Sequence, residues 1–449
     1  MVLSHAVQHR RHLRKWDVSQ AFTQSNKLAV PIYVRPPPGA EDDPDVVWEL
    51  IRPLYGLGIA PKAWSDTLIK FIQSQGWTPA CAGEETVYVK TVDGHSMTLL
   101  FWVDDILLSY DDESIPHIHD FKQAFFSRFA SKDEGPVTQF VGIDVEYDRA
   151  AGVLKISQEP LVQDLLAEYG MSDCNPVDTP MLPNTHLLSA DQSSDPNKLQ
   201  TKAYQHLVGT LQYLVTGTRV DLAYVAHQLS KHLAAPGPKH QAAAIRCLRY
   251  LQGTASRGIT YIVSHLDPDR IISAADSDWA ADPETRKSVT GNVSLMNGGA
   301  IAWKCRRQTG VATSSTEGEV MSASRMAQTV DWLRRVAAGL GCPQSASSPI
   351  FEDNRACRMI SESRSLSTRM RHVDVSVHNV ADYAARKVVK LVDCPTADMF
   401  ADILTKALAG PLFQRHRDVI MGLSPRTTPA LAFCGIHLPA FLVSSLSYT

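Results

Sequence analysis

The sequence predicts a multidomain protein that combines the α/β and α+β classes. Its 449 residues exceed the size of one ordinary domain and suit two or three. A hydrophobic fraction of 44% with 20% charged residues is typical of chains that bury packed cores. Strand-like runs alternate with helical repeats in an early and a late part of the chain, and the part between them is mostly helical. Together these observations indicate two mixed regions separated by a helical one.

The first region, residues 1–170, is expected to contain strands in IYVRP and TLLFWVDDILL. A helix is predicted in AWSDTLIKFIQSQG, where Trp64, Leu68 and Phe71 recur at helical spacing. VGIDVEY alternates between apolar and polar residues and ends before DRAAG, which predicts a strand entering a turn.

The second region, residues 171–265, begins with a polar, proline-rich stretch, MSDCNPVDTPMLPNTHLLSADQSSDPNK, typical of a linker or crossing segment. Three helical runs follow: YQHLVGTLQYL, AYVAHQLSKHL and HQAAAIRCLRYLQG. Lys239, Arg246 and Arg249 lie on the last of them. Two interpretations stay open for these cations, contact with nucleic-acid phosphates or an ordinary solvated helix face.

The third region, residues 266–412, is expected to form an α/β unit. IISAADSDWA, SVTGNVSLMN and AIAWKCRR predict three strands, with a tight turn at NGG, residues 297–299. A long helix is predicted in EVMSASRMAQTVDWLRRVAAGLG, and strands in PIFED and KVVKLVD alternate with further helices, the last in ADMFADILTKAL. Residues 413–449 are apolar without a pattern and form a tail of unassigned role.

Composition limits the class of protein further. The net charge of −3 does not point to nucleic-acid binding, although a local basic groove is compatible with it. Eight scattered cysteines without a CxxC pair argue against a zinc site and against a disulfide framework. No apolar run reaches the roughly 20 residues of a membrane helix, and the N-terminus lacks the order of a secretory signal. We therefore expect no membrane association and an intracellular location.

Two adjacent aspartates, Asp104 and Asp105, interrupt the apolar run LLFWVDDILL. A buried carboxylate without a partner costs several kcal/mol, so a cation or hydrogen bonds should balance the pair. Together with Asp17, these acids suit two divalent cations that promote phosphoryl transfer, because Mg²⁺ prefers carboxylate oxygen. The alternative is a polar hairpin turn at the surface.

A second set of acids lies in the third region. Asp276 ends a predicted strand, Glu319 opens a helix, Asp353 ends another strand, and Asp402 lies on the last helix. Four carboxylates from separate elements suit two Mg²⁺ ions that assist hydrolysis of a phosphodiester.

Alternatives for two of these acids stay open. Asp276 is alternatively a turn residue, with Asp278 or Asp282 as the ligand in its place. Glu319 follows Thr316 at the spacing of a capping box, which closes a helix start without any metal.

The chain resembles the reverse transcriptases of copia-type LTR retrotransposons. The matching stretches are DVSQAFTQS (17–25), IYVRPPPGA (32–40), LYGLGIAPKAW (54–64) and WVDD (102–105). The helical run YQHLVGTLQYLVTGTRVDLAYVAHQLS is similar to the family's linking block. Further on, AADSDWA, SSTEGEV, EDN and ADILTKAL resemble the ribonuclease H domain of the same elements. The resemblance thus implies a polymerase palm region at 1–170, a thumb-like or connection-like segment at 171–265 and a ribonuclease H-like domain at 266–412.

The resemblance also assigns residue roles. It implies that Asp17, Asp104 and Asp105 are catalytic metal ligands of a polymerase site. It places Phe22 as the aromatic gate against the ribose 2′-OH, and it places Gly56 and Pro61 near the template and incoming nucleotide. Trp102 stands where the family has tyrosine, so it keeps an aromatic platform without the hydroxyl.

For the third region, the resemblance implies that Asp276, Glu319, Asp353 and Asp402 are the catalytic metal ligands of a ribonuclease H site. Two Mg²⁺ per active site, with Mn²⁺ as an alternative, are the implied cofactors. The implied partners are an RNA template, a DNA primer, RNA–DNA hybrid and dNTPs.

Two departures from the family shape the functional expectation. Ile59 replaces the family's glutamine, and only a short basic stretch, HRRHLRK, precedes the segment that begins at Asp17. We therefore expect an N-terminally truncated Pol polyprotein piece that largely lacks the fingers. The leading hypothesis is an RNA-directed DNA polymerase with ribonuclease H activity. The alternatives are ribonuclease H activity alone, or an inactive remnant that at most binds nucleic acid.

Overall fold

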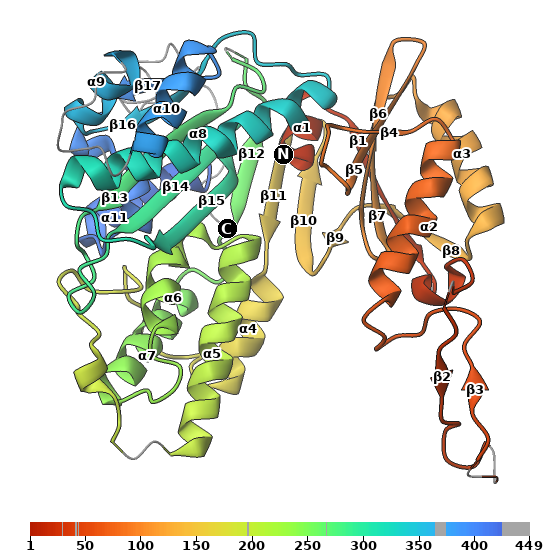
Figure 1. The fold of residues 1–449 in the computed structure, drawn as a ribbon, viewed down its shortest axis with the longest axis horizontal. Helices are drawn as coiled ribbons and strands as arrows, with labels where there is room; N and C mark the ends of the chain where they lie inside the picture. The colour runs from red at the N-terminus through yellow and green to blue at the C-terminus, as the bar shows by residue number, and fades with distance from the viewer. Residues whose placement is uncertain are drawn as a thin grey trace.

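The computed structural model describes residues 1–28, 30–40, 43, 45–194, 197–265, 267–363 and 374–423. Its strands form two large sheets, a smaller sheet and a two-stranded arm. Figure 1 shows the first large sheet on one side of the molecule and the second on the other, with the smaller sheet and the N-terminal helix α1 (Val2–Gln8) between them.

The first sheet has six antiparallel strands. In spatial order they are β4 (Thr78–Pro79), β5 (Val87–Val92), β6 (His95–Trp102), β7 (Asp105–Tyr110), β1 (His12–Val18) and β8 (Ser131–Pro136). Helices α2 (Ala60–Ser74) and α3 (Ile115–Arg128) cover one face (Figure 1). Buried aromatic rings, among them Trp16, Trp64 and Phe125, fill the space between these helices and the strands. The predicted helix and the hairpin around the paired aspartates are both confirmed.

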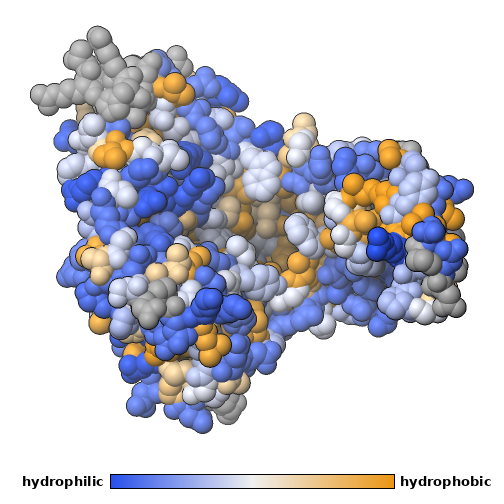
Figure 2. Space-filling view, turned by 60° about the horizontal axis from the view of Figure 1, so that its bottom comes forward, coloured by the Kyte–Doolittle hydropathy of each residue, from blue (hydrophilic) through white to orange (hydrophobic). Residues whose placement is uncertain are grey.

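The two-stranded arm extends from this part of the molecule. It consists of β2 (Tyr33–Val34) and β3 (Trp48–Glu49), and it follows the short 3₁₀ helix η1 (Ala21–Gln24). Exposed large apolar side chains concentrate between residues 30 and 59; they are Val30, Tyr33, Val47, Trp48, Ile51, Leu54, Tyr55 and Ile59. Figure 2 shows apolar surface gathered on one lobe of a face that is hollowed between its two lobes.

The smaller sheet joins distant parts of the chain. Its spatial order is β12 (Ile259–Ile262), β11 (Val153–Ser157), β10 (Ile143–Asp148) and β9 (Gln139–Phe140). The helical block between β11 and β12 comprises α4 (Glu159–Glu168), α5 (Lys198–Gly217), the 3₁₀ helix η3 (Val220–Leu222), α6 (Ala223–Ser230) and α7 (Pro238–Gln252). The polar segment that precedes α5 contains a single short 3₁₀ helix, η2 (Ser189–Asp191), among its described residues, as expected for a crossing segment.

The second large sheet has five strands. In spatial order they are β15 (Gly299–Arg307), β14 (Val289–Met296), β13 (Ile272–Asp278), β16 (Ser348–Glu352) and β17 (Val389–Asp393). The first three pair antiparallel, and β16 and β17 continue in parallel with β13. Helix α8 (Ser315–Gly339) packs on one face together with α9 (Arg355–Ser363) and α10 (Asp374–Ala385). The 3₁₀ helix η6 (Phe400–Leu404) and α11 (Gly410–Ile420) also contact this sheet (Figure 1).

The multidomain α/β prediction is confirmed, and one predicted helix is wrong. ADMFADILTKAL forms two short 3₁₀ helices, η5 (Thr396–Asp398) and η6, instead of an α-helix. Every residue of η6 is buried, so the segment has no solvent-facing side for an amphipathic helix to present.

The region boundaries stay predictions. Helix α11 crosses the boundary expected at 412 and buries Phe413, Val419 and Ile420 against the main core. Residues 424–449 of the expected tail lie outside the described residues. Among the helices that are described, none combines the length and apolar character needed to cross a bilayer.

Candidate active sites

The second sheet gathers three of the predicted acids at one edge. β13 and β16 are parallel neighbours, so Asp276 near the end of β13 and Asp353 just after β16 come to the same edge. Glu319 reaches this edge from the start of α8. One carboxylate oxygen from each of the three lies within 4.8 Å of the others. The sequence pattern and the geometry therefore converge on one site, which we call the acidic cluster.

Burial and mutual repulsion raise the pKa values in the acidic cluster. Asp276 and Glu319 are only 3% and 6% exposed. Burial, followed by the nearby Glu352 and Asp276 charges, raises the pKa of Glu319 to about 11. The pKa of Asp276 is also raised, first by burial, although Lys406 opposes the shift. The described residues offer no hydrogen bond to the buried Glu319 Oε2. Crowded carboxylates with an unsatisfied oxygen fit a divalent cation, which prefers such ligands.

Asp402 lies beside the acidic cluster without joining its tightest group. It is buried in η6, and its Oδ1 lies 2.9 Å from Lys406 Nζ. Burial and the charge of Asp276 raise the pKa of Asp402 to about 7. The neighbouring Thr405 hydroxyl donates a hydrogen bond to Asp276 Oδ2. Lys406 thus supplies positive charge to Asp402 at the border of the cluster.

The structure decides the alternatives left open for Glu319 and Asp282. Ser314, not Thr316, caps α8, because its hydroxyl accepts the Glu317 N–H. The Glu317 side chain accepts a hydrogen bond from the Thr313 N–H at 2.6 Å. The capping-box interpretation of Glu319 is therefore wrong. Asp282 is bound by Lys231 and Arg307, each at 3.1 Å, and it is absent from the acidic cluster.

Sequence reasoning missed Glu352. This residue ends β16 directly before Asp353 and is completely buried. The Asn354 N–H donates to its Oε1 at 3.1 Å, and burial raises its pKa well above the ordinary value. The signal was present in FEDN, because a central strand covered on both faces buries its residues up to the last one, which here is Glu352. Glu352 adds negative charge behind Glu319.

The first sheet holds the other predicted acids. Asp17 on β1 lies directly opposite Asp105 on β7, and Asp104 occupies the turn between β6 and β7. Lys15 Nζ lies 2.8 Å from Asp105 Oδ1, and the Val141 N–H donates to Asp105 Oδ2 at 3.3 Å. The described part of the chain contains three groups of potential metal ligands within 4.8 Å, and these acids are not among them. The structure therefore brings them to one hairpin and pairs Asp105 with a lysine.

Charge repulsion is nevertheless present at this hairpin. Burial and then the Asp104 charge raise the pKa of Asp17, with Glu134 and Asp105 adding to the effect. Asp104 lies in the turn itself, both aspartates raise the pKa of Asp17, and Lys15 compensates Asp105, so the metal-binding role of the pair stays a prediction.

The turn itself is strained. Val103 adopts a positive φ of 54°, which is unfavourable for a β-branched residue. The Trp64 indole N–H donates to the Val103 carbonyl at 2.5 Å and holds this conformation from α2. Trp102 precedes the turn and is 57% exposed, so its ring is available as a platform.

Three further predicted binding residues lie near this hairpin or on α2. Phe22 in η1 packs against Tyr55 with ring centroids 4.6 Å apart. The charges of Asp104 and Asp17, after burial, raise the pKa of Tyr55, which places this ring beside the acids. Gly56 follows Tyr55 with φ +94°, a conformation that glycine tolerates best. Pro61 is exposed in the first turn of α2.

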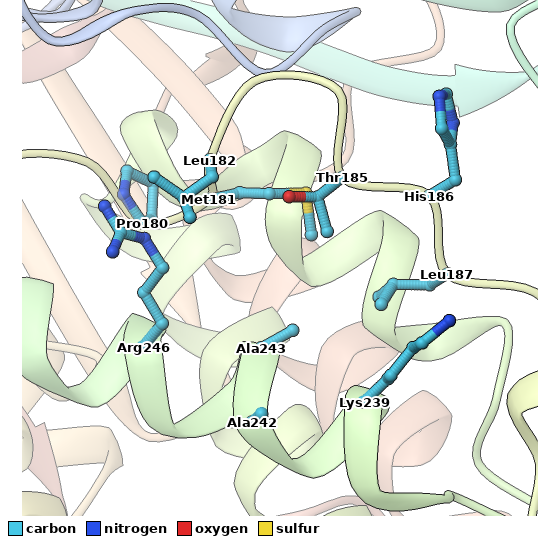
Figure 3. Close-up of a pocket in the computed structure, with 10 residues that line it drawn as sticks. All are labelled: Pro180, Met181, Leu182, Thr185, His186, Leu187, Lys239, Ala242, Ala243 and Arg246. Carbon is cyan, nitrogen blue, oxygen red and sulfur yellow. The ribbon is translucent and has the colours of Figure 1, made fainter.

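The basic residues of the helical block have partners within the chain. Arg246 donates to Thr179 at 3.0 Å, Lys239 Nζ lies 2.6 Å from Asp191, and Arg249 donates to the Asn175 carbonyl at 2.8 Å. Figure 3 shows Arg246 and Lys239 on α7, at the two ends of a pocket of about 250 Å³ under the 180–187 segment. These cations hold the crossing segment on α7.

Comparison with known proteins agrees with this arrangement. Residues 1–183 match the family model described as reverse transcriptase (RNA-dependent DNA polymerase). The Pol polyprotein of transposon RE1 from Arabidopsis thaliana is 31% identical over 94% of this chain and 28% of its own length. The Pol polyprotein of transposon TNT 1-94 from Nicotiana tabacum is 28% identical over 93% of this chain and 31% of its own.

A solved compost-derived RNase H1 superposes at a TM-score of 0.25 with 13% identity, covering 30% of this chain and 93% of its own. The chain thus begins with a region that matches the reverse transcriptase family model, and its last large sheet is a mixed sheet of antiparallel and parallel strands. Over most of its own length the chain is similar to the Pol polyproteins of retrotransposons. It spans between 28% and 31% of the length of the three full Pol polyproteins that match it over most of its residues.

Proposed function

We propose that this chain hydrolyses the RNA strand of RNA–DNA hybrids at the acidic cluster and uses divalent cations to do so. The carrying observation is the convergence of Asp276, Glu319 and Asp353 oxygens within 4.8 Å. The comparison with known proteins supports nucleic acid as the substrate, since the matching relatives are named as Pol polyproteins.

The residues of the acidic cluster fit two Mg²⁺, with Mn²⁺ as the alternative. Bound there, the cations supply Lewis-acid stabilisation of the phosphate and lower the pKa of the attacking water. Asp276, Glu319 and Asp353 would hold the cations. Two of these acids lie at strand ends and the third at the start of a helix. Asp402 lies beside them as the fourth acid, and Lys406 neutralises its charge until substrate and cations arrive.

The proposed contact with the hybrid includes the outer strand of the second sheet and α8. A pocket of about 490 Å³ lies between the helical block and the second sheet and includes Trp303, Lys304 and Trp332. The exposed indole of Trp332 and the exposed Lys304 suit stacking and phosphate contacts. Trp332 and Lys304 are therefore the proposed contacts of the hybrid backbone at a distance from the cluster.

A second activity, RNA-directed DNA synthesis, is supported by the hairpin of the first sheet. Asp17 and Asp105 face each other across neighbouring strands, and Asp104 adds a third carboxylate at the turn. Lys15 must release Asp105 before that carboxylate binds a cation. The exposed Tyr55 ring packs on the buried Phe22 next to these acids, where an incoming dNTP would pair with the RNA template and extend the DNA primer.

The test uses the full chain in two assays with Mg²⁺. One assay follows cleavage of labelled RNA in an RNA–DNA hybrid, and the other follows primer extension on an RNA template. Asp353→Asn should lower hybrid cleavage by roughly two orders of magnitude, about 3 kcal/mol, and Asp105→Asn should leave it intact. Primer extension should be lost in Asp105→Asn and retained in Asp353→Asn.

The outcomes separate the candidate functions. Hybrid cleavage that survives Asp105→Asn, together with no extension, leaves ribonuclease H activity alone. Absence of both activities in the unmodified chain overturns the proposal in favour of a remnant that at most binds nucleic acid.

A further inference from the structure

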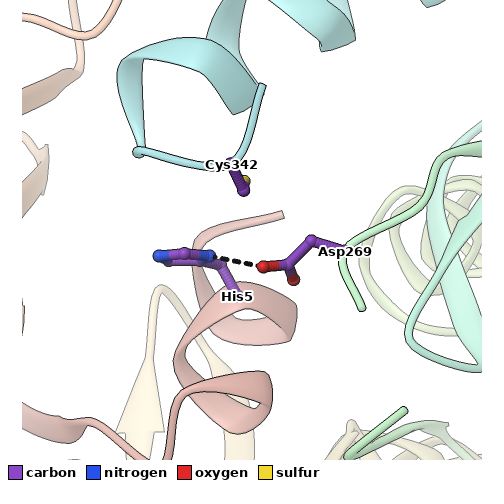
Figure 4. A group of neighbouring side chains, drawn as sticks. All are labelled: His5, Asp269 and Cys342. Carbon is purple, nitrogen blue, oxygen red and sulfur yellow. Dashed lines mark hydrogen bonds and ion pairs between the residues drawn. The ribbon is translucent and has the colours of Figure 1, made fainter. Parts of the chain in front are cut away.

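A compact cluster of metal-binding side chains lies far from both acidic sites. It forms where α1 meets the loop before β13 and the residues after α8 (Figure 4). His5 Nδ1 lies 3.1 Å from Asp269 Oδ2, and a ligand atom of Cys342 lies within 4.8 Å of both. His5 and Asp269 are buried, and Cys342 is half-buried.

A fourth candidate ligand contacts the same carboxylate. His9 is the C-cap residue directly after α1, four positions beyond His5, and its Nε2 lies 2.7 Å from the same oxygen, Asp269 Oδ2. The two imidazole rings have centroids 4.4 Å apart. Two histidines four residues apart on one helix face are a common metal-binding arrangement. With one carboxylate and one thiol, they complete a four-ligand set that suits tetrahedral Zn²⁺.

The neighbouring groups orient the carboxylate. The Asn297 side-chain amide donates to Asp269 Oδ1 at 2.7 Å, and the Asp269 N–H donates to Asn297 Oδ1 at 3.0 Å. Only Oδ2 therefore faces the histidines. Hydrogen bonds that fix a ligand from behind are typical of protein metal centres.

The cluster also has a route to solvent. The His9 side chain is 47% exposed, whereas Asp269 is 4% exposed. A cation arriving from solvent meets His9 first and then the buried ligands, without any rearrangement of the sheets.

We propose that His5, His9, Asp269 and Cys342 form a structural Zn²⁺ site that fastens α1 to the domain built on the second sheet. On binding, Cys342 becomes a thiolate and its proton leaves to solvent. The site joins the N-terminal helix to residues 269 and 342 of the domain built on the second sheet, so it serves folding and cohesion and takes no part in phosphoryl transfer. Its ligands are far apart in sequence, so the absence of CxxC spacing does not bear on it. The competing explanation is a plain His–Asp–His hydrogen-bonded clamp, in which Cys342 only caps α8 by donating to the Ala337 carbonyl at 3.2 Å.

The experiment measures zinc content and cobalt spectra of the full chain in excess Mg²⁺, which saturates oxygen-only sites. We expect a zinc-to-chain ratio near one after dialysis against a weak chelator. Substitution by Co²⁺ should produce a thiolate-to-cobalt charge-transfer band, which carboxylate sites do not give. Cys342→Ser should abolish this band, and the matched control Cys174→Ser should keep it.

A second variant covers the event that Cys342→Ser does not fold. His9→Ala removes an exposed ring and should weaken zinc binding at least tenfold. Adding zinc should then raise the Tm of this variant less than that of the unmodified chain. The proposal is overturned by a zinc-to-chain ratio near zero, or by a cobalt spectrum that is unchanged in Cys342→Ser.

Discussion

Glu319→Gln offers a test in which stability and activity should move in opposite directions. The folded-state pKa of this carboxyl, about 11, lies above its ordinary value of 4.5, so folding favours the protonated form. Stability is therefore lost progressively as the pH rises from 4.5 towards 11, in the absence of a cation. Each pH unit costs about 1.4 kcal/mol, which amounts to about 5 kcal/mol at pH 8.

Glutamine removes that cost, but its buried amide destabilises the folded state by about 2 kcal/mol. A net gain of about 3 kcal/mol corresponds to a Tm increase of about 5 °C or more at pH 8 in chelator. The gain should shrink towards pH 5. With Mg²⁺ the Tm advantage of Glu319→Gln over the unmodified chain should shrink or change sign, because only the unmodified cluster binds the cation well. Hybrid cleavage should fall by roughly two orders of magnitude.

Thermal melting at pH 5 to 9, in chelator and in Mg²⁺, measures these effects. Glu317→Gln is the matched control, since it makes the same substitution two residues earlier on α8 at a residue that accepts the Thr313 N–H. It should lower Tm slightly, without dependence on Mg²⁺. A Glu319→Gln chain that melts below the unmodified chain at every pH in chelator would refute the crowding argument.

Three further predictions follow from buried groups outside the acidic cluster. Arg219→Met should destabilise the chain by about 3–5 kcal/mol in urea unfolding, because it leaves Asp221 buried and uncompensated. Adding Asp221→Asn should recover part of this loss. A loss below about 1 kcal/mol in Arg219→Met contradicts a stabilising role of the buried ion pair. Burial lowers the pKa of His416 from 6.5 to about 4, so its contribution to stability is complete above pH 6.5 and is lost as the pH falls towards 4. His416→Gln should flatten the fall of Tm over that pH window, and an unchanged slope rules out this buried neutral imidazole as its source. Trp64→Phe removes the hydrogen bond to the strained Val103 carbonyl and should slow primer extension more than hybrid cleavage, so equal losses in both assays argue against a role of this bond in the hairpin.

Local turn and strand chemistry made much of the fold predictable. The NGG motif closes a two-residue turn in which Asn297 and Gly298 adopt φ of 51° and 97°, and Met296 pairs with Gly299 as the hairpin prediction requires. The three acids of the acidic cluster were predictable because each stands at the end of a strand or the start of a helix, where side chains from neighbouring elements meet.

Long-range partners were not predictable from these patterns. β12 completes a sheet with β11 across the whole helical block, since Ile259 pairs with Ile156. The ion pair between Lys15 and Asp105 depends on the register of β1 against β7, which nothing in the local sequence specifies. Ser314 caps α8 in place of the predicted Thr316, because two overlapping pairs of Ser or Thr with Glu compete for one helix start.

The charge of Glu352 escaped notice for a related reason. Its neighbour Asp353 carried the resemblance to the family, whereas the significance of Glu352 depends on its complete burial behind Glu319. The clamp of His5 and His9 on Asp269 likewise joins residues more than 250 positions apart in the sequence.

The most direct test of cation-assisted hydrolysis is a crystal of the full chain grown with MnCl₂ and measured at an anomalous-scattering wavelength. We predict two manganese peaks about 4 Å apart, held by oxygens of Asp276, Glu319 and Asp353. The same crystal of Asp353→Asn should lose at least one of them. An unmodified chain with no anomalous peak within coordination distance of these three carboxylates would contradict the proposed site.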